Sequence, residues 1–302
     1  MRNTTIYIGD IMKLKQLFIA PAVILTLLSA TQNSWAENYH QFEVAGNYTD
    51  MNSDGGMETS GYAGGALAYL NPVSTKNYPY AESQFLSREP YVAAILGHID
   101  MKLLSEDIGG NVYMLGGGYF SQNFPIFAEI MYGKSDLDGE INSNKLDYSV
   151  VTKQVNIGVY FNKLTAAKIS YNKSNYEVSS ASNSEEGDTD QYQLVFKKIV
   201  KASKSSFFNV EAIAGYEKDS DGDVDRQLGL LTDYYPNQSL GFGFGVRVIK
   251  GDSESSEGKD IVLRAKKFIT PSFSIGLTFD KFLADNGDSD SQNVQIDGEF
   301  RF

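Results

Sequence analysis

The chain has 302 residues and a net charge of −12, and it contains no cysteine and only two histidines. This composition excludes disulfides, thiolate metal sites and a three-histidine metal centre, and a pI near 4.7 argues against a nucleic-acid partner. At 42% hydrophobic and 13% aromatic residues, the chain is too rich in core-forming residues to be disordered. We therefore expect a folded protein without a metal ion or other cofactor.

The first feature along the chain is an apolar run over residues 17–30, which two lysines precede and small residues ending at Ala36 follow. A basic start, a short apolar core and a small-residue exit are typical of a secretory signal peptide. The run is shorter than the roughly 20 residues that a membrane-spanning helix needs. We predict that residues 1–36 are a cleaved signal peptide, which begins at either Met1 or Met12.

Residues 37–302 are expected to form one exported domain, and apolar and polar residues alternate throughout it. In one segment, for example, Phe208 and Val210 alternate with Asn209 and Glu211. A period of two is typical of β-strands with one apolar face, and a length of about 10 residues suits a transmembrane strand. We count 14 such segments, near residues 39–49, 60–70, 90–101, 110–120, 125–134, 146–160, 164–176, 190–199, 206–217, 224–235, 239–250, 260–269, 272–283 and 291–302.

Three of these segments depart from simple alternation. The segments 60–70 and 110–120 are rich in glycine and apolar on both faces, so the direction of their side chains stays open. The segment 146–160 changes phase near Val150 and Val151. Such a change predicts either a β-bulge or an extension of the strand above the membrane.

The connections between the segments also alternate, between an acidic kind and a short kind that contains proline, asparagine or lysine. All six prolines after residue 36 fall in or next to the short kind, where they are expected to interrupt no strand. The acidic connections hold 24 acidic and 2 basic residues, over residues 50–59, 105–108, 135–144, 180–190, 217–225, 251–260 and 284–290. Outer-membrane barrels have this asymmetry, with longer outer loops and tight periplasmic turns, whereas a soluble β-sandwich has no reason to sort charge in this way.

The pattern therefore predicts an all-β fold, a transmembrane antiparallel β-barrel of about 14 strands in the cell outer membrane, with 12 or 16 strands as alternatives. The final segment supports this location because it resembles the terminal assembly signal of bacterial outer-membrane proteins. Its alternating residues are Val294, Ile296, Gly298, Phe300 and Phe302. The resemblance implies that the barrel-assembly machinery of the outer membrane is a partner.

A second resemblance covers about 20 residues after the second segment. The matching positions are Leu70, Asn71, Pro72, Val73, Lys76, Pro79, Ala81, Glu82, Phe85, Leu86 and Arg88. This stretch resembles a segment of the gammaproteobacterial "putative porin" family, from which Tyr80 and Gln84 depart. The resemblance implies a small general porin of the outer membrane. We expect the stretch itself to be an unusually long periplasmic turn, with a lid on the barrel mouth as the alternative.

The polar faces of the strands should line the interior, because the apolar faces should meet lipid. Fourteen strands leave room for an aqueous channel, and the charged pore-lining candidates are Glu43, Glu129, Lys168, Glu211, Arg247, Arg264, Lys266, Asp280, Asp297 and Glu299. We interpret Arg247, Arg264 and Lys266 as a basic wall that lies beside an acidic wall and sets ion selectivity. Ordinary salt bridging within the lumen is the alternative.

The sequence predicts a porin, a water-filled channel through which small hydrophilic solutes or ions diffuse passively. One alternative is a barrel enzyme acting on lipid or peptide, for which His98 and Asp100, placed on one inward face, are the candidates. Another is a structural or adhesive barrel without channel activity. The acidic stretch 219–225 lacks the glycine and glutamate positions of a calcium loop. We therefore assign no catalytic residue and no metal ligand.

The expected partners are outer-membrane lipid and lipopolysaccharide, together with the solutes or ions that pass. No connection is long enough to fold inward as the constriction loop of trimeric porins does, which favours a monomer, and a trimer remains the alternative. The sequence does not predict the solute, the ion selectivity or a gating stimulus.

Overall fold

We describe the fold from a computed structural model. It describes residues 39–302 apart from residues 55, 75–77, 104–105, 122, 142–143, 181–183, 252–256 and 286–289. The expected signal peptide lies outside the described residues. Among these residues, no helix is long and apolar enough to cross a membrane.

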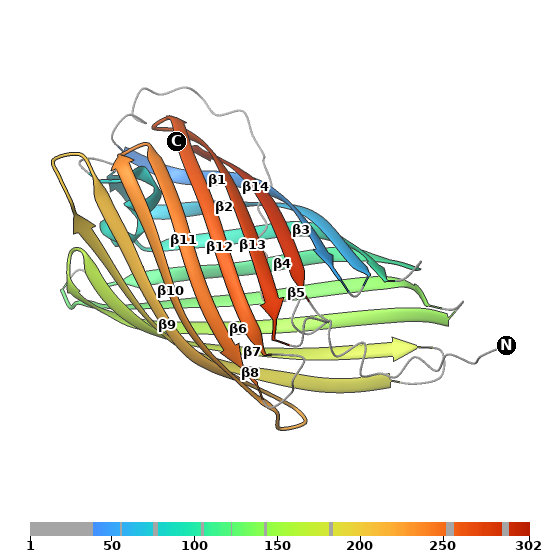
Figure 1. Ribbon diagram of the computed structural model, residues 1–302. Helices are drawn as coiled ribbons and strands as arrows, with labels where there is room; N and C mark the ends of the chain where they lie inside the picture. The colour runs from blue at the N-terminus through green and yellow to red at the C-terminus, as the bar shows by residue number, and fades with distance from the viewer. Residues whose placement is uncertain are drawn as a thin grey trace.

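The described residues form 14 β-strands that close into one antiparallel barrel (Figure 1), as predicted. The strands are β1 (Tyr39–Ser53), β2 (Met57–Ser74), β3 (Tyr91–Leu103), β4 (Glu106–Phe120), β5 (Ile126–Ile141), β6 (Asn144–Asn162), β7 (Thr165–Ser180), β8 (Ser184–Lys201), β9 (Phe207–Asp219), β10 (Val224–Asn237), β11 (Leu240–Lys250), β12 (Gly258–Thr270), β13 (Phe273–Ala284) and β14 (Ser291–Arg301). Each strand pairs with its neighbours in sequence, and β1 pairs with β14 to close the ring. A closed barrel leaves no unpaired strand edge in the membrane.

Apolar side chains face outward along the strands, as the alternation predicts. On β13, Ile275 and Leu277 are about half exposed, whereas the alternating positions Ser274 and Gly276 are buried. The glycine-rich β2 now has a direction, because Tyr62 is 54% exposed while Ala63 beside it is buried. Lipid-facing apolar side chains of this kind are what a transmembrane barrel requires.

Seven outward-facing tyrosines form a band around much of the barrel, which we call the tyrosine girdle. Its members are Tyr48, Tyr62, Tyr113, Tyr132, Tyr171, Tyr192 and Tyr216. Tyr48 lies opposite Tyr62 in the β1–β2 ladder, and the ring of Tyr192 lies 4.9 Å from Tyr171 and 5.0 Å from Tyr216. Aromatic girdles mark the membrane–water interface. Strand residues beyond the girdle on the side away from the chain termini therefore lie outside the hydrocarbon region.

The wall of the barrel is taller on one side than on the other. Strands β5 to β8 have 16 to 19 residues, whereas β11 to β14 have 11 to 13. The prediction that 135–144 and 180–190 are loops was wrong, because β5, β6 and β8 run through most of both ranges. Two of the acidic residues in these ranges make contacts across the extended hairpins, where Asp136 accepts a hydrogen bond from Ser149 and Asp188 pairs with Lys173.

The apparent phase change near Val150 has its cause in this extension. The β5–β6 ladder is unbroken across it, so there is no bulge. Above the girdle the inward face is apolar, where Leu137, Leu146, Tyr148 and Val150 belong to one buried cluster that continues onto β3 and β4. Below the girdle the apolar residues of the same strand face outward. The reversal comes from the surroundings of the strand, and the extension alternative is the correct one.

Two prolines lie inside strands, contrary to prediction. Pro72 is in β2 and Pro236 is in β10, each close to the periplasmic end. At both places the ladder is irregular, with register shifts between His40 and Phe42 on the partner of β2 and between Tyr234 and Asn237 on β10. A proline cannot donate to a ladder, so it is tolerated where the ladder is already broken.

Candidate functional site: the lumen and its periplasmic mouth

All ten predicted pore-lining residues lie on the inward faces of their strands. The evidence is their alternation with exposed apolar neighbours, as for Glu211 between Val210 and Ala212 and for Asp297 between Ile296 and Gly298. His98 and Asp100 were predicted to face inward as well, and this was wrong. They share the outward face of β3 with Leu96, and the His98 ring stacks on Tyr62 of the girdle. Neither residue therefore lies in the lumen.

The basic residues of the lumen are paired with carboxylates. Arg247 on β11 lies 2.5 Å from Asp260 on β12, and Lys266 lies 2.6 Å from Glu299. Arg264 makes a bidentate pair with Asp233 through Nε and Nη2. The interpretation as a basic wall beside an acidic wall was therefore wrong. Side chains on adjacent strands are within reach of one another, so opposite charges combine locally instead of separating.

Carboxylates from the two strands that close the barrel gather with three basic groups near the periplasmic end, namely Arg301, Lys266 and His40. Arg301 contacts Glu299 and lies 3.3 Å from Glu43, while His40 Nε2 lies 2.6 Å from the Glu43 carboxylate. Asp297 extends the group, 3.8 Å from Lys266. The cluster has three carboxylates against two cations that are always charged, which leaves this part of the lumen negative.

Glu129 and Lys168 form a smaller polar group on the other side of the lumen. Glu129 accepts hydrogen bonds from the Tyr91 hydroxyl at 2.9 Å and from Asn156 at 3.1 Å, and Lys168 Nζ is 3.8 Å from it. Asp280 on β13 lies diagonally across the ladder from Asp260, and both face inward. The lumen thus carries charged side chains on β5 and from β7 round to β14 and β1, whereas the inward faces of β2 to β4 present residues such as Ala63, Ile95 and Val112. The charged part of the wall favours water and polar solutes over lipid.

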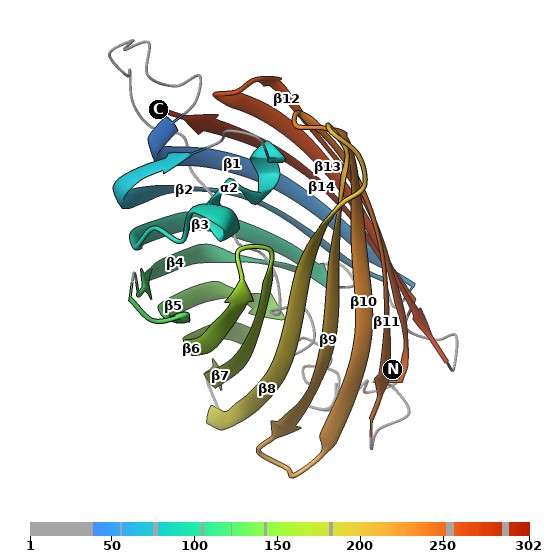
Figure 2. The same ribbon diagram turned by 90° about the vertical axis from the view of Figure 1, so that its left-hand side faces the viewer.

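The connection between β2 and β3 lies across the periplasmic mouth and is not a simple turn. It contains a 3-10 helix, η2 (Tyr80–Glu82), and a short α-helix, α2 (Ser83–Ser87), and Figure 2 shows α2 within the ring of strand ends. We call residues 78–88 the mouth segment. The lid alternative is therefore correct and the expected turn was wrong.

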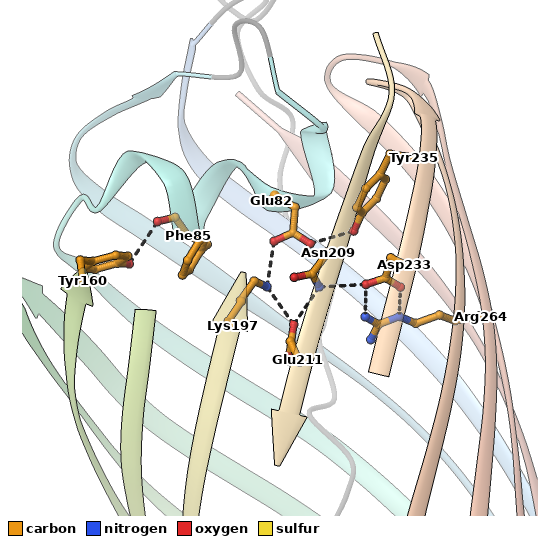
Figure 3. A network of polar contacts seen from close by, with 9 residues as sticks. All are labelled: Glu82, Phe85, Tyr160, Lys197, Asn209, Glu211, Asp233, Tyr235 and Arg264. Carbon is orange, nitrogen blue, oxygen red and sulfur yellow. Dashed lines mark hydrogen bonds and ion pairs between the residues drawn. The ribbon is translucent and has the colours of Figure 1, made fainter. Parts of the chain in front are cut away.

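Glu82 connects the mouth segment to the opposite wall (Figure 3). It is only 5% exposed, accepts a hydrogen bond from Tyr235 at 2.8 Å and lies 2.8 Å from Lys197 Nζ. Lys197 also pairs with Glu211 at 2.9 Å. Asn209 then links Glu211 to Asp233, at 2.9 and 3.0 Å, and Asp233 pairs with Arg264 as described above. One continuous network therefore runs from the mouth segment through β8, β9 and β10 to β12.

Aromatic contacts hold the rest of the mouth segment. The ring of Phe85 lies 5.4 Å from Tyr160, whose hydroxyl donates to the Phe85 carbonyl at 3.1 Å. Tyr80 packs edge-on against Phe268 at 5.4 Å, and its carbonyl accepts a hydrogen bond from Arg301 at 2.7 Å. These contacts reach β6, β12 and β14, so the segment is attached on several sides of the ring.

Arg88 ends α2 with a left-handed backbone, at φ 58°. Its guanidinium lies 3.8 Å from the centre of the Tyr160 ring and donates to the carbonyl of Asn162 at 2.6 Å. Burial lowers the pKa of this guanidinium from its ordinary value. Because a non-glycine residue is strained at positive φ, these contacts are what keep Arg88 in place.

The residues described hold no cluster of His, Asp and Glu that could ligate a metal. In the stretch 219–225, one Asp219 oxygen accepts the backbone N–H groups of both Asp221 and Asp223 at 3.0 Å. The alternating carboxylates therefore belong to a hydrogen-bonded turn.

Comparison with solved structures finds other outer-membrane channels. The chain is similar to Omp33 of Acinetobacter baumannii, with 18% identity and a TM-score of 0.56 over 88% of this chain and 100% of that one. It is also similar to the monoaromatic hydrocarbon channel CymD, with 9% identity and a TM-score of 0.52 over 88% of this chain and 90% of that one. These likenesses support the fold. No curated protein matches the sequence.

The family comparison covers nearly the whole chain. Residues 13–302 match the family described as "Putative general bacterial porin". The match includes the closed barrel, the charged lumen and the mouth segment, and it places the protein in the outer membrane. The chain belongs to this porin family.

Proposed function

We propose that the protein is a passive diffusion channel for small hydrophilic solutes or ions and that its mouth segment limits what passes. The observation that carries the proposal is the lumen, where ten charged side chains predicted from sequence face inward in a closed barrel. An interior with charged groups along most of its wall is hydrated, and a hydrated bore conducts small polar solutes without chemistry.

The mouth segment supports a narrow size limit. Glu82, Phe85 and Tyr80 occupy the periplasmic opening and bind residues on β6, β8, β10 and β12. A solute has to pass beside these side chains or wait for the segment to move. We infer that the channel passes water and small ions freely and admits larger solutes only when the segment is displaced.

The charges support weak cation preference. Each arginine of the lumen has a carboxylate partner, and the cluster of Glu43, Asp297 and Glu299 exceeds its arginine and lysine partners in number. Carboxylates in excess attract cations into a pore. This excess of carboxylates replaces the interpretation as a basic wall that lies beside an acidic wall.

We propose no covalent chemistry and no cofactor for this protein. His98 and Asp100, the pair considered for an enzyme, lie on the outer wall at the level of the girdle. The two ring nitrogens of His98 lie within hydrogen-bond distance of Asn111 and Asp100, at 3.1 Å each. As partners we propose lipopolysaccharide and the barrel-assembly machinery, the latter through β14.

Single-channel recording tests the proposal. The chain 37–302 is refolded in detergent and inserted into a planar bilayer, with a salt gradient across it. We expect stable conductance steps and a reversal potential on the cation-selective side. A folded barrel that gives no steps at any voltage would contradict the channel function, and lipid hydrolysis would then be assayed.

A further inference from the structure

The outer wall of the barrel carries a row of basic side chains beside and just above the tyrosine girdle. We call this row the basic belt, and its members are Lys134, Lys153, Lys173, Lys218, Arg226, Lys250, Lys259 and Lys281. Several follow a girdle tyrosine by two positions, as Lys173 follows Tyr171 and Lys218 follows Tyr216, and therefore share its outward face. Lys153 lies directly opposite Tyr132, and Arg226 directly opposite Tyr216. The belt occupies the level of the lipid headgroups.

Like charges face each other within the belt. Lys153 on β6 is the direct register partner of Lys173 on β7, and Arg226 on β10 is the direct partner of Lys250 on β11. Like charges directly opposite on two strands destabilise a sheet. One member of each pair, Lys173 or Lys250, has carboxylate partners within the protein, so it is at Lys153 and Arg226 that an anion from outside would offset charge.

Half of the belt has carboxylate partners within the protein. Lys134 pairs with Asp136 at 2.8 Å, Lys173 with Asp188, and Lys250 with Asp285 at 2.8 Å and Glu257 at 3.0 Å. Lys259 lies 3.9 Å from Asp285. The partners Asp136, Asp188, Glu257 and Asp285 lie on the side of the belt away from the girdle, and Asp190 is a carboxylate at the level of the belt itself.

The other half forms no hydrogen bond or ion pair with any residue that the structure describes. These four are Lys153, Lys218, Arg226 and Lys281. Asp190 is the register partner of Lys218, but it accepts a hydrogen bond from Tyr171 at 2.7 Å and lies 3.6 Å from Lys173. Four cations at the headgroup level are therefore available to a ligand.

The belt covers only part of the circumference. On β1 to β4 the positions next to the girdle are Asp50, Ser60, His98 and Asn111. A ligand attracted by the belt would therefore bind along β5 to β13 and not along β1 to β4. The outer leaflet of this membrane consists of a glycolipid whose sugar headgroup bears phosphates at this depth, and phosphates are the anions that lysine and arginine bind most readily.

We propose that the basic belt binds the phosphate groups of lipid A, the membrane anchor of lipopolysaccharide, along β5 to β13. The proposal specifies where the general lipid contact of this protein becomes a binding site. It depends on the location of the protein in the outer membrane and not on its channel activity. Basic clusters beside membrane-spanning segments bind anionic headgroups elsewhere by the same electrostatics.

Native mass spectrometry of the refolded chain 37–302 in detergent tests the proposal, with bisphosphorylated lipid A as the probe. The variant K153Q/K218Q/R226Q/K281Q removes the four unpaired cations. The control K163Q/K198Q/K201Q/K267Q removes the same charge from exposed positions near the periplasmic end. We expect the belt variant to bind lipid A at least about tenfold more weakly and the control to bind like the unmodified chain. Both variants should keep the conductance of the unmodified chain in a bilayer of neutral lipid.

Thermal unfolding supplies a second readout that depends on folding alone. Without lipid A, we expect the belt variant to unfold at the same or a higher temperature, because repulsion is removed. With lipid A, the unmodified chain and the control should gain stability while the belt variant does not. Equal binding by belt variant and control would overturn the proposal. Binding of dephosphorylated lipid A or of phosphatidylglycerol as tight as that of the bisphosphorylated form would overturn it as well.

Discussion

The carboxylate of Glu82 lies 2.8 Å from the ammonium group of Lys197, which joins the connection after the second strand to the far wall of the barrel. Tyr235 donates to the same carboxylate at 2.8 Å. Glu82 is thus the polar group through which the mouth segment is held in the opening. One buried carboxylate therefore fixes the mouth segment to β8 and β10.

Replacing Glu82 with alanine should release the segment. Loss of one partner from a buried polar contact costs about 1–3 kcal/mol, which corresponds to roughly a 5- to 150-fold shift toward the displaced state. We expect more frequent and larger openings in single-channel recordings. Glu89 is the matched control, because its carboxylate binds Asn71 in an exposed position outside the mouth segment. Equal traces for Glu82→Ala and Glu89→Ala would show that this contact does not hold the segment.

Exchanging residues 79–87 for a short glycine–serine linker should enlarge the pore permanently. The strands β2 and β3 are antiparallel neighbours, so a short connection can join them. We expect the conductance to rise and the flux of larger sugars into liposomes to increase. A conductance that stays the same would mean that the narrowest part of the channel lies elsewhere in the lumen.

Removing arginines from the lumen should change ion preference. In the variant R247Q/R264Q, Asp260 and Asp233 lose their partners and their negative charge is uncompensated. We expect the reversal potential under a salt gradient to move toward cation preference. The variant D233N/D260N should move it the opposite way. Leaving a buried carboxylate unpaired lowers the free energy of unfolding by about 3–5 kcal/mol. Folding of each variant is therefore checked first, by comparing its electrophoretic mobility with and without prior heating.

The aromatic end of β14 should matter more for assembly than other lipid-facing aromatics. The ring of Phe302 stacks on Phe42 at 6.0 Å, across the seam between the first and last strands. We expect Phe302→Ala to slow barrel formation in the cell and to lower the amount of folded protein in the outer membrane. Phe242→Ala, at a position of similar exposure away from the seam, is the control. Equal loss in both would argue against a special role of the terminal residue.

Histidine 98 should be dispensable for conduction. Because His98 faces outward beside Tyr62, His98→Ala removes a stacking contact of the girdle and nothing from the lumen. We expect unchanged conductance and a small loss of thermal stability, on the order of 1 kcal/mol. A conductance that falls sharply would require a connection between the outer wall and the pore.

The strands could be predicted from sequence because the two faces of a lipid-embedded strand meet opposite environments. On β13, the alternation of Ser274, Ile275, Gly276 and Leu277 is a direct record of lumen and lipid. The alternation no longer separates lumen from lipid above the girdle, because Leu146, Tyr148 and Val150 are apolar on the inward face. The acidic strand residues there also resemble the residues of a loop. The ends of β5 to β8 were therefore misjudged.

The candidate site could be predicted only in part. The inward direction of Arg247, Arg264 and Lys266 follows from period two, whereas their pairing depends on which strand neighbours which and in what register. The mouth segment carries a signal of its own in the aromatic residues Tyr80 and Phe85 beside Glu82, which a solvent-exposed turn would not need. Their partners, such as Tyr235, are far away in sequence, and no local pattern identifies them.

The seam between β1 and β14 also dictates the order of events in the life of the chain. The carbonyl of Phe302 accepts the N–H groups of Gln41 and Phe42, at 2.9 and 2.8 Å, and the ladder continues along β14, so β1 is paired on both sides only when β14 is in place. Its free edge has no partner until the whole polypeptide has crossed the inner membrane. During that interval the unpaired strands, with their apolar faces exposed, have to be kept from aggregating in the periplasm. Export of this protein therefore requires that the incomplete sheet be protected, and any delay in the arrival of β14 prolongs the exposure of the unpaired edge of β1.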